Sequence, residues 1–234
     1  MIKAINNKCV TVFEMTGSDV QAFLNNQVVS EMVTDTTSPQ FTVICNPKGR
    51  VIYTLIIEQQ SNMTLVAVDA SLSDNFLQYV NMRRFRMDVS ISKSKYLLSI
   101  NTAVTPPHFS SDMSFSDANK DFCDDDGFWF FMFKSGLPWT TEQTKECYIP
   151  QHLNLDQSGV IDFEKGCYPG QEIVARLHFL GKVKKRMHYI QYKADQGYKP
   201  NSKAHIPEYN ATVEICAPAF FQQNMWHSQA IIKV

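Results

Sequence analysis

The pattern that most constrains the fold is a pair of apolar runs, 41–45 and 51–57, joined by a short polar segment. Both runs are rich in β-branched and aromatic residues, which favour β-strands. The four residues between them, 46–49, include three strong turn formers, Asn, Pro and Gly. Because so short a turn joins antiparallel strands, we expect a β-hairpin over residues 41–57.

The segments around this hairpin alternate between strand and helix signals. Ser18 and Gln21 have the spacing of a capping box, which predicts a helix that continues to about residue 28. Residues 71–74 can cap a second helix, which presents apolar side chains at helical spacing. The order of the elements predicts an α+β fold with largely antiparallel sheet. The remaining strands are expected at 9–14, 63–68, 87–91 and 96–100.

The second half of the chain predicts a loop followed by further strands. Residues 101–126 are rich in Ser, Pro and Asp, which indicates a long loop or a module boundary. The apolar run 128–133 is typical of a buried strand. Strand composition at 182–192, and in three short runs near residues 204, 212 and 231, predicts a small β module. We therefore expect two interleaved α+β modules within residues 1–180 and a C-terminal β module over 181–234.

Composition and charge exclude several classes of protein. The 234 residues are 44% hydrophobic, which is enough to bury a core. Lys and Arg total 22 against 23 Asp and Glu, so no overall positive field favours stable binding to nucleic acid. The polar N-terminus does not resemble a secretory signal, and the densest apolar run is far shorter than a membrane-spanning helix. We therefore expect a cytoplasmic protein without a membrane partner.

Few motifs in the sequence point to a metal or to a known reaction class. The six cysteines lack the spacing of zinc sites and are expected to be reduced thiols, and no stably bound metal is predicted. Asp121 and the acidic run 124–126 lack the Gly and Glu of a calcium-binding loop and are interpreted as a solvated turn. The chain has no P-loop and no G-x-S-x-G or H-E-x-x-H motif, so the corresponding enzyme classes lose support.

Cys167 is the cysteine whose surroundings indicate chemistry. It lies between Gly166 and a Pro-Gly pair, just before a predicted helical segment, 171–177. The N-terminus of a helix and the nearby Lys165 both favour a thiolate, so we expect the pKa of this thiol to fall below its ordinary value. Glycines beside it let a flat ligand ring or another chain approach closely. The alternative is a buried packing residue, as free cysteines often are.

A basic stretch follows the cysteine segment and allows two interpretations. Its side chains can bind phosphates or carboxylates of a ligand. They can equally form the solvated face of a strand, which is the more common role of a charged run. The residues are Arg176, His178, Lys182, Lys184, Lys185, Arg186 and His188.

The segment 165–172, Lys-Gly-Cys-Tyr-Pro-Gly-Gln-Glu, followed by Val-Ala-Arg at 174–176, resembles the signature of the YgfZ family. This family comprises folate-dependent relatives of the glycine-cleavage T protein. Three further segments are similar to parts of the family's sequence pattern, and the resemblance extends over residues 9–190. These segments are 16–28, 46–50 and 135–138.

The resemblance implies a T-protein-like arrangement of three modules, built from antiparallel sheets with helices, around a central opening that accepts tetrahydrofolate. It also implies a role in assembly or repair of iron-sulfur clusters, and thereby in tRNA modification by radical-SAM methylthio-transfer enzymes. Folate and iron-sulfur proteins or cluster carriers would be the partners. Two alternatives stay open, a tetrahydrofolate-dependent aminomethyltransferase-like enzyme and a ligand-free interaction scaffold.

The resemblance also assigns roles to residues. Any catalysis would be a folate-dependent one-carbon reaction or a thiol-based reaction centred on Cys167, with Lys165 contributing. The aromatic run 128–131 can offer a face to a pterin ring, although a core strand is its commoner role. Where the aminomethyltransferase relatives have an acidic residue that contacts the pterin, this chain has Lys134. The residues expected to contact folate are Phe128, Trp129, Gly170, Gln171, Glu172 and Arg176.

Overall fold

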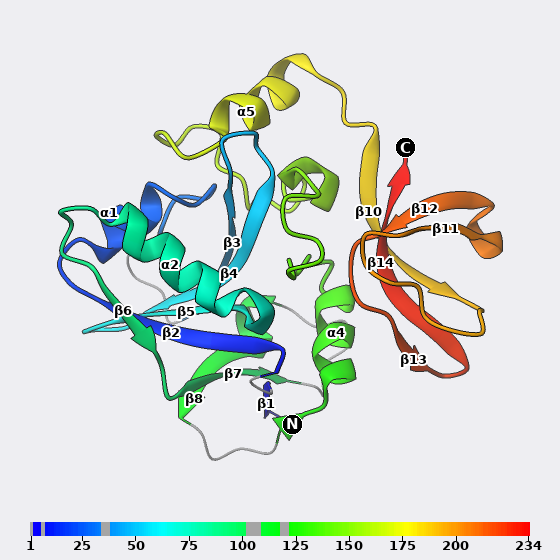
Figure 1. Ribbon diagram of the computed structural model, residues 1–234, viewed down its shortest axis with the longest axis horizontal. Helices are drawn as coiled ribbons and strands as arrows, with labels where there is room; N and C mark the ends of the chain where they lie inside the picture. Colours follow the sequence, from blue (N-terminus) through cyan, green and yellow to red (C-terminus); the bar gives the residue numbers. More distant parts are fainter. Residues whose placement is uncertain (1, 6–7, 34–37, 102–108, 118–121) are drawn as a thin grey trace.

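Three β-sheets with short helices make up the fold, and the computed structural model describes residues 2–5, 8–33, 38–101, 109–117 and 122–234 (Figure 1). The first sheet has the order β3-β4-β5-β2-β6, the second β8-β7-β1-β9, and the third contains β10 to β14. Among the described residues, the strand pairs are antiparallel except for β1 with β9, which is parallel. This arrangement confirms the expected α+β fold of three modules. No helix in the described part of the chain is long and apolar enough to cross a membrane.

The first sheet contains the predicted hairpin, whose strands β3 (Gln40–Cys45) and β4 (Val51–Gln59) pair antiparallel. The side chain of Asn46 holds the turn by accepting hydrogen bonds from the backbone N–H groups of Lys48 and Arg50. Gly49 has a φ of 68°, a left-handed conformation that favours glycine. The other strands of this sheet are β2 (Val10–Thr16), β5 (Thr64–Asp69) and β6 (Ser90–Lys93).

The two helices of the first sheet form where expected, but with different starts. Helix α1 (Val20–Asn25) is not capped by Ser18, whose N–H and hydroxyl both bind the Asp88 carboxylate instead. Helix α2 (Ser73–Arg83) follows a 3-10 turn, η1 (Ala70–Leu72), in which Asp69 accepts a hydrogen bond from the Ser71 N–H. Apolar side chains of both helices pack on the sheet in one buried cluster.

The prediction of a long loop over residues 101–126 is wrong for the part that the structure describes. Helix α3 (Phe109–Asp112) leads into β8 (Met113–Asp117), which pairs with β7 (Tyr96–Asn101). Met113 and Phe115 are buried and alternate with serines, which is the period-two pattern of a strand. The Ser-rich composition of the region led to the prediction of a loop instead. Residues 102–108 and 118–121 lie outside the described residues. The remaining strands of this sheet are β1 (Ile2–Ile5) and β9 (Phe122–Cys123).

The run 128–133 is helical, which corrects the predicted buried strand. Helix α4 (Asp125–Lys134) starts where the Asp124 carboxylate accepts a hydrogen bond from the Gly127 N–H, and Gly136 follows its end with a φ of 68°. The helix contacts both β9 and β14, and Figure 1 shows it beside the third sheet. Five of its six consecutive apolar residues are buried. A helix enclosed in this way has no polar face, so its sequence shows no helical period.

The third sheet is the C-terminal β structure that the sequence predicts. One face has a small apolar cluster of its own, whereas Met187, Phe220 and Ile231 join the large central cluster. The boundary proposed at residues 180 and 181 stays a prediction. The strands are β10 (Lys185–Tyr192), β11 (Lys203–Ile206), β12 (Ala211–Ile215), β13 (Phe220–Gln222) and β14 (Met225–Lys233), with a 3-10 turn η3 (Pro207–Tyr209).

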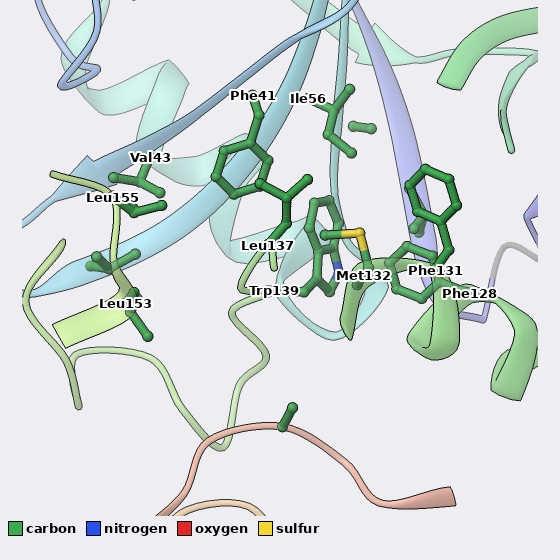
Figure 2. Close-up of a cluster of buried hydrophobic side chains, with 14 of the residues drawn as sticks. Phe41, Val43, Ile56, Phe128, Phe131, Met132, Leu137, Trp139, Leu153 and Leu155 are labelled. Carbon is green, nitrogen blue, oxygen red and sulfur yellow. The ribbon is translucent and has the colours of Figure 1, made fainter. Parts of the chain in front are cut away.

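Side chains from all three sheets and from α4 fill the middle of the molecule. Figure 2 shows Phe41 and Ile56 of the hairpin strands close to Met132 of α4 and to Leu137 and Trp139 beyond it. These side chains are at most 7% exposed. The region where the sheets meet is therefore a packed apolar core at these residues.

Candidate functional site

The cysteine segment 165–172 crosses the tip of the β3–β4 hairpin and leads into helix α5 (Gln171–Leu180), as Figure 1 shows at the top of the molecule. Gly170 precedes the helix with a φ of 82°. A Cβ atom on Gly170 would lie 2.4 Å from the Asn46 carbonyl oxygen and 2.7 Å from the Gly49 Cα. The glycine therefore permits a close approach of two segments of the chain.

This contact joins two of the segments that carry the family resemblance. A Cβ on Gly49 would in turn lie 3.0 Å from the Ile173 Cβ of α5. Behind the helix, the fully buried Gln151, in the 3-10 turn η2 (Pro150–Leu153), donates a hydrogen bond to the Val174 carbonyl oxygen at 2.7 Å. The start of α5 is thus fixed from two sides.

Lys165 is buried, and its ammonium group donates hydrogen bonds to the end of α1 and the loop that follows it. It donates to the carbonyl oxygens of Asn25 and Ser30, each at 2.7 Å, and of Val28 at 2.9 Å. Burial lowers the pKa of Lys165, and the nearby carboxylates of Glu31 and Asp162 oppose this shift. The hydrogen bonds found for this ammonium are all with residues 25–30, so the structure gives it these partners in place of the expected Cys167 thiol.

Cys167 is exposed, which contradicts the alternative of a buried packing residue. Burial raises the pKa of the Cys45 and Cys216 thiols, and also that of the half-buried Cys147. Cys45, Cys147, Cys167 and Cys216 are free thiols, and the described residues contain no group of three or more His, Cys, Asp or Glu that could hold a metal ion. The role of Cys167 as a thiolate stays a prediction.

The aromatic residues expected to face folate lie in the core. The Phe128 ring is fully buried and packs edge-on against Trp129 and Trp139, with centroid distances of 5.2 and 5.6 Å. The face that these rings were expected to offer to a pterin is therefore closed. Lys134, at the end of α4, places its ammonium 5.0 Å from the centre of the Tyr189 ring, a cation-π contact.

The other expected folate contacts lie on helix α5 or, in the case of Gly170, directly before it. Gln171 donates a hydrogen bond to the Lys165 carbonyl oxygen, and Glu172 and Arg176 are exposed. The expected contacts are thus divided between the apolar core and the surface. As arranged here, these residues do not fit tetrahydrofolate.

The basic and acidic stretches have mainly structural roles. Arg186 forms a two-point ion pair with Asp156, and Lys185 lies 3.5 Å from Glu214. His178 stacks on Phe163 at a centroid distance of 3.7 Å. The acidic residues at 124–126 begin helix α4, so they do not form the expected turn, and Asp121 lies outside the described residues.

Sequence reasoning missed a buried carboxylate beside the aromatic core. Asp69 accepts hydrogen bonds from the Ser71 N–H and hydroxyl, and from the Trp139 indole N–H at 3.0 Å. Burial raises the pKa of Asp69 to about 6. The spacing Asp-Ala-Ser at the end of a strand is a turn signal that could have drawn attention to this residue.

Comparisons with known proteins agree with this fold. No family model matches the chain. The tRNA-modifying protein YgfZ of Aliivibrio fischeri is 25% identical over 217 residues, which cover 75% of this chain and 67% of that protein. The YgfZ protein of Colwellia psychrerythraea is 42% identical over 64 residues, or 27% of this chain. An iron-sulfur cluster assembly factor IBA57 homolog of Coccidioides immitis is 38% identical over 86 residues, or 36% of this chain.

The last two alignments each span only 20% of the relative's length. Among solved structures, aminomethyltransferase T of the glycine cleavage system from Bartonella henselae matches with a TM-score of 0.64 at 10% identity. The match covers 99% of this chain and 78% of that protein, and at this identity it concerns the fold alone. The chain is thus similar in sequence to YgfZ and IBA57 proteins and has the fold of a glycine-cleavage T protein.

Proposed function

We propose that this protein supports iron-sulfur proteins that act in tRNA modification, and that it does so through Cys167. The names of the YgfZ and IBA57 relatives supply the two halves of this function, tRNA modification and cluster assembly. The clients that we propose are radical-SAM methylthio-transfer enzymes with four-iron clusters. The chemistry would involve the thiol in assembly or repair of a client's cluster.

The observation that carries the proposal is an exposed thiol in a segment whose two flanks are fixed. Cys167 is exposed, whereas Lys165 on one side is buried and bonded to residues 25–30. On the other side, Gly170 is in close contact with the hairpin turn. A thiol presented in this way can meet a macromolecular partner with little loss of backbone entropy.

The helix that follows Cys167 supports a protein partner. Val174 is the one residue of α5 that is buried, although the helix contains six apolar residues. Ile173, Phe179 and Leu180 are 42%, 67% and 83% exposed. Exposed apolar side chains can mark an interaction surface, and we propose that a client or cluster carrier covers those of α5.

The folate part of the function is a separate proposal, on which no step depends. A T-protein-like fold favours tetrahydrofolate as a ligand, but the closed faces of Phe128 and Trp129 favour the second candidate, a folate-free interaction scaffold. Calorimetric titration of tetrahydrofolate into the full chain separates the two. Saturable heat at micromolar protein concentration contradicts the folate-free scaffold, and a flat titration at millimolar folate contradicts folate dependence.

The role of Cys167 is tested by replacement in cells that lack the protein. We expect Cys167→Ser to accumulate normally but to leave the activities of iron-sulfur enzymes and the methylthio content of tRNA unrestored. Cys147→Ser, which changes a half-buried thiol, is the matched control and should restore both. Activities are assayed in extracts, and modified nucleosides are quantified by mass spectrometry. Full restoration by Cys167→Ser would contradict the proposal.

A further inference from the structure

A pocket of about 380 Å³ lies at one end of the third sheet. At this end β10 begins and β14 ends near the C-terminus, as Figure 1 shows. Lys185, Lys203 and Lys233 line it from three different strands. The buried Ile231 projects from the same face of the sheet as these lysines and forms an apolar wall beside them. None of these residues belongs to the cysteine segment or to α5, so the pocket is separate from the site proposed above.

The strand register places like charges face to face in this pocket. Lys185 of β10 is directly opposite Lys233 of β14, and residues directly opposite each other project from the same face of a sheet. Two like charges in this position destabilise a strand pair. Glu214 is the carboxylate that lines the pocket, opposite Lys203 and 3.5 Å from the Lys185 ammonium.

The positive charge of the pocket is therefore only partly neutralised. Lys203 and Lys233 are exposed and have no ion-pair partner among the residues that the structure describes. Three ammonium groups and one carboxylate leave a net charge of two positive units.

We propose that this pocket binds a phosphate monoester that carries an apolar or aromatic body. A phosphate monoester has a charge of about −1.5 to −2 at neutral pH, which matches the excess positive charge. Lysine ammonium groups bind phosphate as point charges, and Thr212 adds a hydroxyl to the lining. The pocket is too large for phosphate alone, and its apolar wall suits an organic body such as a nucleoside.

The experiment titrates AMP, inorganic phosphate and adenosine into the full chain at low ionic strength, with heat as the readout. We expect saturable binding of AMP, weaker binding of phosphate, no binding of adenosine, and a loss of AMP affinity as salt is added. The double variant Lys203→Met, Lys233→Met should bind AMP at least about tenfold more weakly, since two charge-assisted contacts are lost.

The matched control is the double variant Lys193→Met, Lys199→Met, which removes the same charge from exposed lysines outside the pocket. It should bind AMP as the unaltered chain does, and thermal unfolding of both variants checks that they are folded. Equal affinity in the two double variants would overturn the proposal, as would the absence of saturable heat with both AMP and phosphate at millimolar concentration.

A further arm identifies the source of the phosphate. Purified tRNA, with its terminal monophosphate intact or removed by phosphatase, competes against a fluorescent AMP analogue. Competition only by tRNA that retains its terminal phosphate assigns the pocket to an RNA end. Competition by AMP and not by tRNA assigns it to a small metabolite.

Discussion

Helix α4 and the cysteine segment 165–172 are held in the structure by different kinds of contact. Apolar side chains enclose α4 on almost every side, and volume and shape hold it in place. The cysteine segment is held by backbone approach at Gly170 and by hydrogen bonds from one buried ammonium, while Cys167 itself stays exposed. The difference teaches that the two regions have separate roles, since α4 supports the fold and the segment presents a reactive group.

The largest effect is expected from emptying the aromatic core. Phe128→Ala should lower the free energy of unfolding by about 3–5 kcal/mol, because the ring is fully buried between other rings and leaves a cavity. Urea unfolding followed by fluorescence measures this change. The control Phe179→Ala removes an exposed ring from α5 and should cost less than about 0.5 kcal/mol. Similar losses in both variants would end the contrast between core and surface.

The next largest effect is expected at Gly170, in the cysteine segment. Gly170→Ala should lower the free energy of unfolding by about 3 kcal/mol, because it combines a left-handed backbone with a collision at the Asn46 carbonyl oxygen. Gly159→Ala isolates the backbone term, since Gly159 has a φ of 74° but no atom within 4 Å of an added Cβ. It should cost about 1 kcal/mol. Equal costs would show that the hairpin contact is not what fixes the segment.

A smaller effect concerns the carboxylate at the edge of the core. Burial raises the pKa of Asp69 to about 6, so between about pH 4 and 6 the folded state binds more protons at this group than the unfolded state. Stability contributed by protonated Asp69 is therefore present below about pH 4 and lost as pH rises to 6. The loss should be roughly 2–3 kcal/mol.

Urea unfolding at several pH values, compared between the unaltered chain and Asp69→Asn, isolates this term. The difference in the free energy of unfolding should shift in favour of Asp69→Asn as pH rises from 4 to 6. Asp74→Asn is the matched control, because the Asp74 side chain is 84% exposed, and it should show no such shift. A constant difference for Asp69→Asn across this range would contradict a raised pKa.

The same two regions show how far the sequence can predict the structure. The hairpin at 41–57 and the helix after Cys167 have strong local turn signals, and both are confirmed. Helix α4 was mistaken for a strand because a run of apolar residues is compatible with either element when every side is buried. Its acidic start and the Lys134 end were the signals that distinguish a helix.

Other parts of the site depend on contacts that no local signal carries. Lys165 donates hydrogen bonds to the carbonyl oxygens of Asn25, Val28 and Ser30, which precede it in the sequence by 135 to 140 positions. Every residue has a carbonyl group, so the sequence does not indicate which of them the lysine will contact. Trp139 reaches Asp69 across 70 positions. The family signature identified the cysteine segment, but what its lysine and its glycines contact could be learned only from the fold.

The smallest effect on stability, and the sharpest test of exposure, is at Cys167 itself. Cys167→Ser should change the free energy of unfolding by less than about 0.5 kcal/mol, because an exposed side chain has little packing to lose. Under native conditions iodoacetamide should alkylate Cys167 well before Cys147, whose pKa is raised by burial, and should leave Cys45 and Cys216 unmodified. Peptide mapping by mass spectrometry assigns each site. Equal rates at Cys167 and Cys45 would mean that the core opens as readily as the segment, and the two regions would then not differ as argued.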